Sequence, residues 1–240
     1  MSTYLDYLNQ ISSPKTFLRK TKYIKYNFGK YLIFKNPSDI KVLEIGSGLG
    51  ETIHYLNDKG IGTVDVADND QTVLNYVNDK FKIDNLFHID DVHRLDNTLD
   101  SYDAIIATQV LEHLPKNECV YFLNILLNHL KKDGHIIITV PNMANPFTLC
   151  ERYADTTHEN GFTDNSLRGL AAKCDIPSSS VEIKEFNIPP YSPINVIRIV
   201  LQKALHMVIL LLSIVNGGSY STLLTPNITL VIKGNLGSDL

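Results

Sequence analysis

A glycine-rich turn between an apolar run and a helical run is the feature that most constrains the fold of this chain. Residues 42–50 read Val-Leu-Glu-Ile-Gly-Ser-Gly-Leu-Gly. The apolar start is typical of a buried strand, and residues 51–59 have a helical pattern. Glycines let a ligand approach the backbone where a Cβ would clash, and a helix start offers free N–H groups to an anion. The turn indicates a strand–loop–helix unit that either binds a ligand or serves as a tight connection.

Two common nucleotide-binding loops do not fit this turn. A dinucleotide fingerprint, G-x-G-x-x-G, would place its third glycine at position 51, which is Glu51. A P-loop would continue with Gly-Lys-Ser or Gly-Lys-Thr, and neither follows. An NAD-dependent oxidoreductase and a P-loop nucleotidase are both disfavoured.

Short apolar runs alternate with amphipathic ones from residue 40 to residue 142, which predicts βαβ units and a parallel sheet. After residue 142 the rhythm changes, and two further strands are predicted around a long apolar segment. The predicted strands are 41–45, 62–67, 86–89, 104–107, 135–140, 181–186 and 227–233, and the predicted helices are 51–59, 71–80 and 116–131.

Composition narrows the class of protein. The chain has 240 residues and a net charge of −4, which predicts one domain with additions and disfavours a nucleic-acid partner. Three widely spaced cysteines without a C-x-x-C pair argue against a disulfide framework or a zinc site. The first ten residues show no signal-peptide pattern. A cytoplasmic protein is expected.

Acidic residues follow two successive predicted strands, at the sheet edge where α/β proteins bind ligands. Asp68 lies 22 residues after Gly46, the spacing at which a carboxylate accepts bonds from ribose hydroxyls. Asp91 and Val92 follow the next strand and offer a carboxylate and a backbone N–H that suit adenine. Each aspartate alone could be a helix cap or a turn residue. Their common register favours the ligand interpretation.

Three further segments complete a pattern. Residues 101–106 read S-Y-D-A-I-I, residues 109–114 read Q-V-L-E-H-L, and L-K-K-D-G-H at 130–135 leads to V-P-N at 140–142. With the glycine turn, these resemble the ordered motifs of the class I S-adenosylmethionine-dependent methyltransferases over residues 38–176. The nearest subgroup includes the ubiquinone-biosynthesis O-methyltransferases and many small-molecule or sugar methyltransferases. The one departure is D-G-H where P-G-G is usual.

The resemblance implies an α/β fold: a Rossmann-like, doubly wound sheet of seven strands, mostly parallel, with an antiparallel last strand. It implies S-adenosylmethionine as cofactor and S-adenosylhomocysteine as product. Glu44, Gly46, Gly48 and Gly50 would surround the methionine part, Asp68 the ribose, Asp91 and Val92 the adenine, and Gln109 the sulfonium end. Ser47 and Asn69 complete the predicted cofactor set.

A hydroxyl acceptor needs a general base, and two histidines are candidates. His113 follows the fourth predicted strand, where a packing role is an equal alternative. His158 lies in D-T-T-H-E-N-G-F-T, which resembles the family's acceptor-side segment, and is slightly favoured. No metal is expected, because adjacent residues such as Glu112 and His113 do not face one point on a helix.

Two flanking regions concern the acceptor. Residues 15–35 hold seven basic residues, no acidic one and several aromatics, which predicts a helical lid (residues 1–38) on a methyltransferase domain (39–240). A solvated helix face is the alternative. Residues 194–215, within an insertion at about 190–218, are mostly apolar, with Arg198, Gln202 and His206 as a polar stripe. A core helix or a homodimer interface is favoured over peripheral membrane contact at the inner membrane face.

The expected activity is methyl transfer to a hydroxyl of a small molecule, a sugar or polysaccharide, or a lipid-linked acceptor, which the basic lid would allow to be anionic. The alternative is a non-catalytic S-adenosylmethionine-binding or membrane-recruitment module on the same fold.

Overall fold

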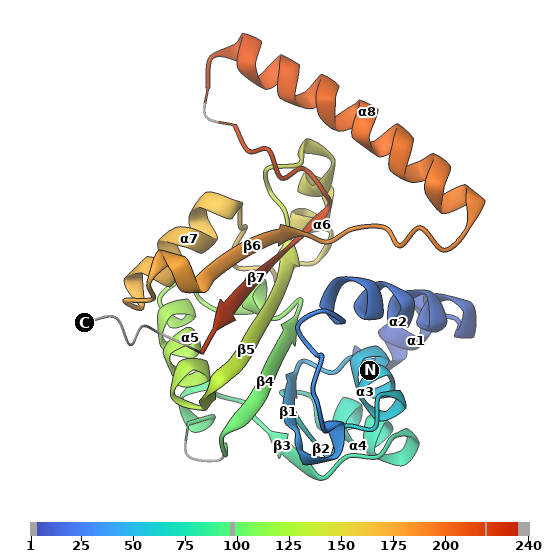
Figure 1. Cartoon of the computed structure of the whole chain (residues 1–240), viewed down its shortest axis with the longest axis vertical. Helices are drawn as coiled ribbons and strands as arrows, with labels where there is room; N and C mark the ends of the chain where they lie inside the picture. The colour runs from blue at the N-terminus through green and yellow to red at the C-terminus, as the bar shows by residue number, and fades with distance from the viewer. Residues whose placement is uncertain (1–3, 97–98, 219, 235–240) are drawn as a thin grey trace.

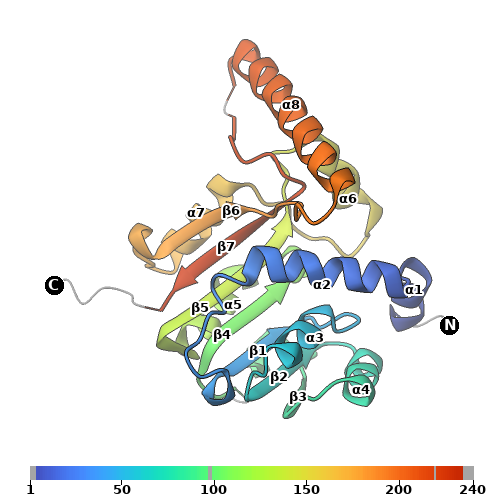
Figure 2. The same ribbon diagram turned by 45° about the vertical axis from the view of Figure 1, so that its right-hand side comes forward.

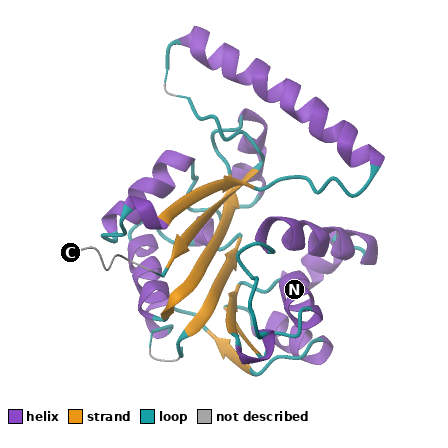
Figure 3. Cartoon of the chain, viewed as in Figure 1, coloured by secondary structure: helices purple, strands orange, loops and turns teal. Residues whose placement is uncertain are grey.

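The computed structural model, which describes residues 4–96, 99–218 and 220–234, contains one seven-stranded sheet with helices on both faces (Figures 1 and 3). The strand order is β3-β2-β1-β4-β5-β7-β6, and only β7 runs antiparallel to its neighbours. The strands are β1 (Lys41–Ile45), β2 (Thr63–Asp68), β3 (Asn85–His88), β4 (Tyr102–Thr108), β5 (Leu130–Pro141), β6 (Val181–Glu185) and β7 (Asn227–Lys233). The predicted fold class is confirmed.

Helices precede the sheet and connect its strands. They are α1 (Tyr4–Ile11), α2 (Pro14–Phe28), α3 (Glu51–Asp58), α4 (Gln71–Lys80), α5 (Glu118–Asn128), α6 (Leu149–Ala154), α7 (Asp164–Lys173) and α8 (Pro193–Asn216). Short 3₁₀ turns are η1 (Pro37–Asp39), η2 (Val92–Arg94), η3 (Leu111–His113), η4 (Pro146–Thr148) and η5 (Ser178–Ser180). Side-chain caps begin several of them, as the Asp70 carboxylate does for α4.

The strands bury apolar residues on both faces, which is why they read as continuous apolar runs. Along β1, Leu43 and Ile45 join a core that includes residues of α5 and α7. Val42 points the other way, into a second core with Ile53 of α3 and Phe28 of α2. The two cores hold the carboxyl ends of β1, β2 and β4 in fixed register, and the site is built on those ends.

The boundaries of most elements lie within two residues of the predicted ones, and β5 is the largest difference. It begins at Leu130 rather than at residue 135. Leu130 pairs with Tyr102, and the register then shifts before His135 pairs with Ala104. The charged residues in this irregular stretch conceal its strand conformation, because their side chains are exposed.

Helix α8 contradicts the favoured interpretation of a core helix. None of its residues is buried, and Figures 1 and 2 show it standing off the body of the molecule. It connects the end of β6 to the start of β7. The two cores are already filled by the strands and by the helices on the sheet faces. An apolar composition indicates that a helix packs against an apolar environment, but it does not indicate whether the protein core, a partner or a membrane provides that environment.

Candidate active site

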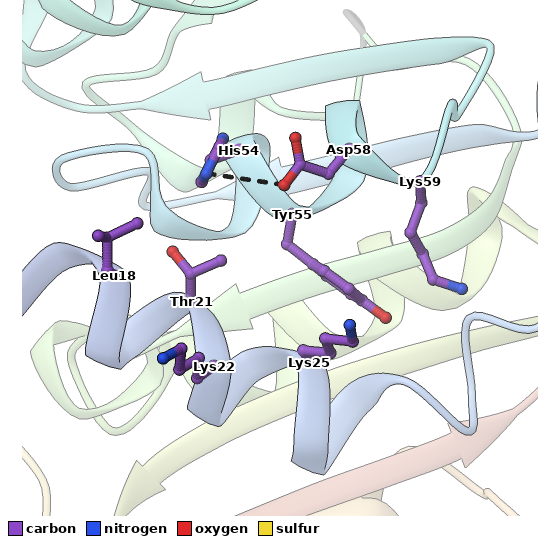
Figure 4. Close-up of a pocket in the computed structure, with 8 residues that line it drawn as sticks. All are labelled: Leu18, Thr21, Lys22, Lys25, His54, Tyr55, Asp58 and Lys59. Atoms are coloured by element: carbon purple, nitrogen blue, oxygen red, sulfur yellow. Dashed lines mark ion pairs between the residues drawn. The ribbon is translucent and has the colours of Figure 1, made fainter. Parts of the chain in front are cut away.

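A large cleft of about 1820 Å³ lies at the carboxyl ends of the central strands. It is lined by the glycine turn after β1, the ends of β2 and β4, and side chains from α1 and α2. A smaller hollow of about 320 Å³ lies between α2 and α3 and shares no lining residue with it; Figure 4 shows Lys22, Lys25 and Tyr55 there. The position of the large cleft is the one where open α/β sheets bind ligands.

The three glycines of the turn all have positive φ angles, but they serve different purposes. Gly46 has φ +73°, and a Cβ there would lie 2.4 Å from Cγ2 of Val110. Gly50 has φ +87°, and a Cβ there would lie 2.3 Å from the ring of Phe81. Gly48 has φ +52°, and the nearest atom to a Cβ there would be a Glu51 carboxylate oxygen at 4.0 Å. Packing therefore requires glycine at 46 and 50, whereas position 48 borders open space in the cleft.

The Asp68 carboxylate is held in place by backbone donors. One oxygen accepts bonds from the Ser47 backbone N–H at 2.9 Å and the Ser47 hydroxyl at 3.4 Å. The other accepts a bond from the backbone N–H of Asp70 at 3.0 Å. Burial raises the pKa of Asp68, which these bonds oppose. Each oxygen keeps acceptor capacity toward the cleft, so the group fits a pair of ribose hydroxyls.

Glu44 is a buried carboxylate at the base of the cleft. Burial raises its pKa well above the ordinary value, while the Thr52 hydroxyl and the Ile53 backbone N–H oppose that shift. Its Oε2 atom has no hydrogen-bond partner in the described part of the chain. An N–H group of a ligand would satisfy this oxygen, and the ammonium of S-adenosylmethionine fits that requirement.

The predicted adenine residues line the cleft, and one of them also caps a helix. The Asp91 carboxylate accepts a bond from the His93 backbone N–H at 2.8 Å and so begins η2. Val92, Asn69 and Asp91 all line the cleft. The cap interpretation and the ligand interpretation are therefore compatible at Asp91, because the cap occupies one oxygen.

Gln109 adopts a strained backbone conformation at the end of β4, with φ +57°. Its backbone N–H donates to the Thr139 carbonyl at 2.9 Å, and its side chain lies 3.4 Å from Oδ1 of Asn227. Asn227 and Thr139 both line the cleft. Sequence reasoning missed these two residues, because nothing in the sequence shows that β5 and β7 pair beside β4.

His113 belongs to a short hydrogen-bonded chain on the opposite wall of the cleft. Its Nδ1 lies 2.9 Å from the Thr157 hydroxyl, which donates to the Asp155 carboxylate at 2.6 Å. Because that hydroxyl proton points at Asp155, the hydroxyl accepts from Nδ1–H of His113, and Nε2 carries the lone pair. Burial and the neighbouring His158 lower the pKa of His113, which favours the neutral ring.

His158 packs edge-on against His113, with ring centroids 4.6 Å apart. The two predicted catalytic residues therefore lie together, although 45 positions separate them in the sequence. Backbone N–H groups of Glu159 and Asn160 bond the Glu112 carbonyl and dock this segment onto η3. Of the two histidines, His113 is the one that lines the cleft.

The side chains of Glu112, His113 and His158 converge, contrary to the argument that Glu112 and His113 face different points. One ligand-type atom of each lies within 4.8 Å of the others. Glu112 is 1% exposed, and neither carboxylate oxygen has a hydrogen-bond partner among the described residues. Burial raises its pKa to about 8. The 3₁₀ turn, rather than an α-helix, brings the adjacent pair together.

Residues of the N-terminal helices line the cleft, as a lid would. Tyr4 and Tyr7 of α1 and Arg19 and Tyr23 of α2 contribute to the lining. Burial raises the pKa of Tyr4, and Asp68 and Asp155, on opposite walls, add to the shift. The Lys20 ammonium lies 3.1 Å from the Glu51 carboxylate at the start of α3.

Comparison with solved structures finds the same fold in several methyltransferases. A SAM-dependent methyltransferase from Archaeoglobus fulgidus is 20% identical, with a TM-score of 0.62, over 89% of this chain and 94% of that one. A complex of the Haloferax volcanii Trm112 methyltransferase activator with a methyltransferase is 13% identical, with a TM-score of 0.67, over 98% of this chain and 99% of that one. The plantazolicin methyltransferase BpumL in complex with SAH is 15% identical, with a TM-score of 0.53, over 94% of this chain and 93% of that one. No curated protein matches the sequence.

The model of one family, described as a methyltransferase domain, matches residues 17–175. That range contains the glycine turn, Asp68 and both histidines. S-adenosylmethionine is the cofactor, and the open space beside Gly48, the Asp68 carboxylate and the unpaired Glu44 oxygen suit its parts. The chain belongs to this methyltransferase-domain family.

Proposed function

We propose that this methyltransferase acts on oxygen, in the manner of the ubiquinone-biosynthesis and sugar O-methyltransferases that its motifs resemble. The observation that carries the proposal is the chain His113–Thr157–Asp155 at the edge of the cleft. A hydroxyl acceptor must lose its proton as the new bond forms, and a neutral histidine with a free Nε2 can receive it.

S-adenosylmethionine supplies an activated methyl group with a good leaving group. The protein then has to align the acceptor oxygen, exclude water and take the proton. We assign proton acceptance to Nε2 of His113, with Asp155 and Thr157 holding the ring in the correct tautomer. His158, the other histidine predicted to be catalytic, packs against that ring without lining the cleft, so we assign it the role of positioning His113.

The cofactor residues keep their predicted assignments in this proposal. Backbone groups at Gly46, Ser47, Gly48 and Gly50, with Glu44, hold the methionine part. Asp68 and Asn69 hold the ribose, Asp91 and Val92 the adenine, and Gln109 the sulfonium end. All of these except Gly50 line the cleft, and Gly50 shapes the turn from behind.

The acceptor in this proposal is a small molecule or a glycan- or lipid-linked hydroxyl compound that carries negative charge. Arg19 of α2 and Arg198 of α8 line the same cleft and offer positive charge to such an acceptor, among more numerous carboxylates. Lys20 is paired with Glu51 and contributes less. Residues 1–38 then act as a lid on the domain formed by 39–240.

The test is methyl transfer from labelled S-adenosylmethionine to panels of anionic hydroxyl compounds, with His113→Ala, His158→Ala and His54→Ala compared. His54 lies at the hollow between α2 and α3 and serves as the matched histidine control (Figure 4). The proposal predicts loss of turnover in the first two variants, with cofactor affinity retained in all three. Cofactor binding without turnover on any acceptor would favour the non-catalytic binding module instead.

A metal-assisted version of the same reaction has one supporting observation, the convergence of Glu112, His113 and His158. We propose the metal-free version; the hydrogen bond between Nδ1 of His113 and Thr157 leaves Nε2 available either to a proton or to a metal, so chelation decides between the two versions. Turnover that survives a chelator supports the metal-free version. Turnover lost on chelation and restored by a divalent cation would replace it.

A further inference from the structure

Helix α8 presents an apolar face to the outside of the molecule. It has 24 residues, none buried, and is about 36 Å long. Its outward side chains are 42% to 76% exposed. They are Ile194, Val196, Ile197, Val200, Leu201, Leu205, Met207, Val208, Leu211, Leu212, Ile214 and Val215. A soluble monomer rarely exposes a contiguous apolar surface of this extent.

The polarity of α8 differs from that of a helix packed on a soluble domain. The side turned toward the protein is of mixed polarity, and its partly covered residues are Asn195, Ile199, Gln202, His206, Ile209, Leu210 and Ser213. Arg198 lines the cleft. A helix packed on a soluble domain buries its most apolar side, whereas α8 leaves most of its large apolar side chains exposed. The outward face of α8 therefore calls for an apolar environment.

We propose that α8 lies in the surface of an anionic phospholipid bilayer, with its outward face among the upper acyl chains. At about 100° per residue, the exposed apolar side chains span about half of the helix circumference. Contact with a helix of a second copy needs a narrower stripe, whereas half-immersion in lipid uses this whole arc. Arg198 and Lys203 lie at the two borders of the arc, where their side chains can reach headgroups.

The path of the chain determines that the helix lies in the membrane plane. The end of β6 and the start of β7 are neighbours, since Glu185 pairs with Ile228. If α8 crossed the bilayer, residues 217–226 would have to cross back. That stretch reads Gly-Gly-Ser-Tyr-Ser-Thr-Leu-Leu-Thr-Pro. It is too short for a spanning helix, which needs about 20 residues, and as a lone extended segment it would leave backbone groups unpaired in lipid.

The charge of the N-terminal segment indicates an anionic surface. Residues 15–35 carry seven basic residues and no acidic one, in a chain whose net charge is −4. Helix α8 also has no acidic residue. Helix α2 lines the cleft with Arg19 and Lys20, and α8 lines it with Arg198, so the basic segment and one border of the apolar arc meet at the same opening. Each basic residue near an anionic membrane strengthens binding by about fivefold.

The first experiment is co-sedimentation of the full chain with vesicles of phosphatidylcholine alone or mixed with phosphatidylglycerol. The variant L211D/V215D charges the outward face at two exposed positions. N78D/S179D is the charge-matched control, because Asn78 on α4 and Ser179 in η5 are exposed and belong neither to the basic segment nor to α8. We expect binding to the mixed vesicles, a loss of about tenfold or more in L211D/V215D, and a much smaller loss in N78D/S179D.

A second experiment reads the depth of the helix. The chain has no tryptophan, so Leu211→Trp introduces a unique fluorophore. Lipids brominated at different depths then quench the tryptophan fluorescence. We expect the strongest quenching from bromines near the headgroups, both for Leu211→Trp and for Val200→Trp. Quenching at Leu211→Trp strongest at the bilayer centre would show a spanning helix and overturn the in-plane arrangement.

Two results would reject the membrane proposal. One is equal vesicle binding by the wild-type chain and L211D/V215D, with cofactor affinity showing that both are folded. The other is no vesicle binding by a dimer that L211D/V215D converts to monomer, which assigns the face to a second copy. No acceptor is present in these measurements, so either result leaves the proposed methyl transfer unaffected.

Discussion

The two walls of the cleft are built in different ways. On the cofactor wall, the glycine turn and Asp68 come from consecutive βα units, and backbone N–H groups hold the carboxylate. On the acceptor wall, His113 meets Thr157 and His158 across more than 40 residues of sequence, through side chains. The first wall depends on backbone geometry that the sheet fixes, whereas the second depends on the docking of one loop onto η3.

This difference has an energetic consequence. The backbone N–H groups that hold Asp68 move little when a nearby side chain is altered, because they belong to the strands and the turn. The acceptor wall contains Glu112, whose unpartnered carboxylate sits beneath the docked loop. We expect substitutions on the acceptor wall to change turnover and pH behaviour, and substitutions on the cofactor wall to change binding.

The largest effect is expected from His113→Ala. Loss of the proton acceptor should lower kcat by about 100-fold to 10,000-fold, with little change in the dissociation constant of S-adenosylmethionine. Because the neutral ring is the active form and its pKa is lowered, wild-type activity should fall only as the pH drops below the ordinary histidine range. Steady-state kinetics against pH, with calorimetry of the cofactor, measure both. Equal loss of affinity and turnover would contradict the separation of the two walls.

Asp68→Asn should weaken cofactor binding by about tenfold to 100-fold, since one charge-assisted acceptor for the ribose is lost. Asp70→Asn is the control. Asp70 caps α4 through a bond from the Thr72 N–H at 2.7 Å, and asparagine caps equally well. Calorimetric titration with S-adenosylmethionine and S-adenosylhomocysteine compares the two. An affinity unchanged by Asp68→Asn would remove the ribose assignment.

Glu112→Gln tests the buried carboxyl of the acceptor wall. Its pKa is raised to about 8 in the folded protein from an ordinary value of 4.5, so the folded state binds more protons between these values. Wild-type stability should therefore fall as the pH rises through this window, by up to about 1.4 kcal/mol per pH unit. The variant should lack that slope.

Urea unfolding of both proteins at several pH values, with chelator present, provides the measurement. A wild-type stability that does not decline toward pH 8 would mean that the Glu112 charge is compensated. If adding a divalent cation then stabilises the wild-type chain and not Glu112→Gln, the cluster with His113 and His158 is a metal site.

The smallest effects should come from the glycine turn. Gly50→Ala forces a Cβ against Phe81 at a positive φ angle, which should cost about 1–3 kcal/mol of folding free energy. Gly48→Ala meets open space, so its cost should be smaller, at about 1 kcal/mol, and its main effect should be on cofactor affinity. Thermal unfolding and calorimetry of the two variants separate the roles. The reverse order of stability loss would show that the turn is packed differently.

The sequence by itself determined the sheet, the glycine turn and the cofactor wall. Strand periodicity places Asp68 and Asp91 after the ends of two adjacent strands. The glycine turn depends only on residues close to it in the sequence. The positions of these residues in the sheet therefore follow from their positions in the sequence. The family match over residues 17–175 rests on the same local patterns.

Only the tertiary structure decided the acceptor wall and the surroundings of α8. The pairing of β7 beside β5 brings Asn227 to Gln109, and loop docking brings His158 to His113. Neither contact has a sequence signal, because both join segments whose separation is set by packing. For α8 the sequence gives its apolarity, but which side faces the protein depends on how the helix leaves β6. That orientation leaves Gln202 and His206 partly covered and most of the large apolar side chains exposed.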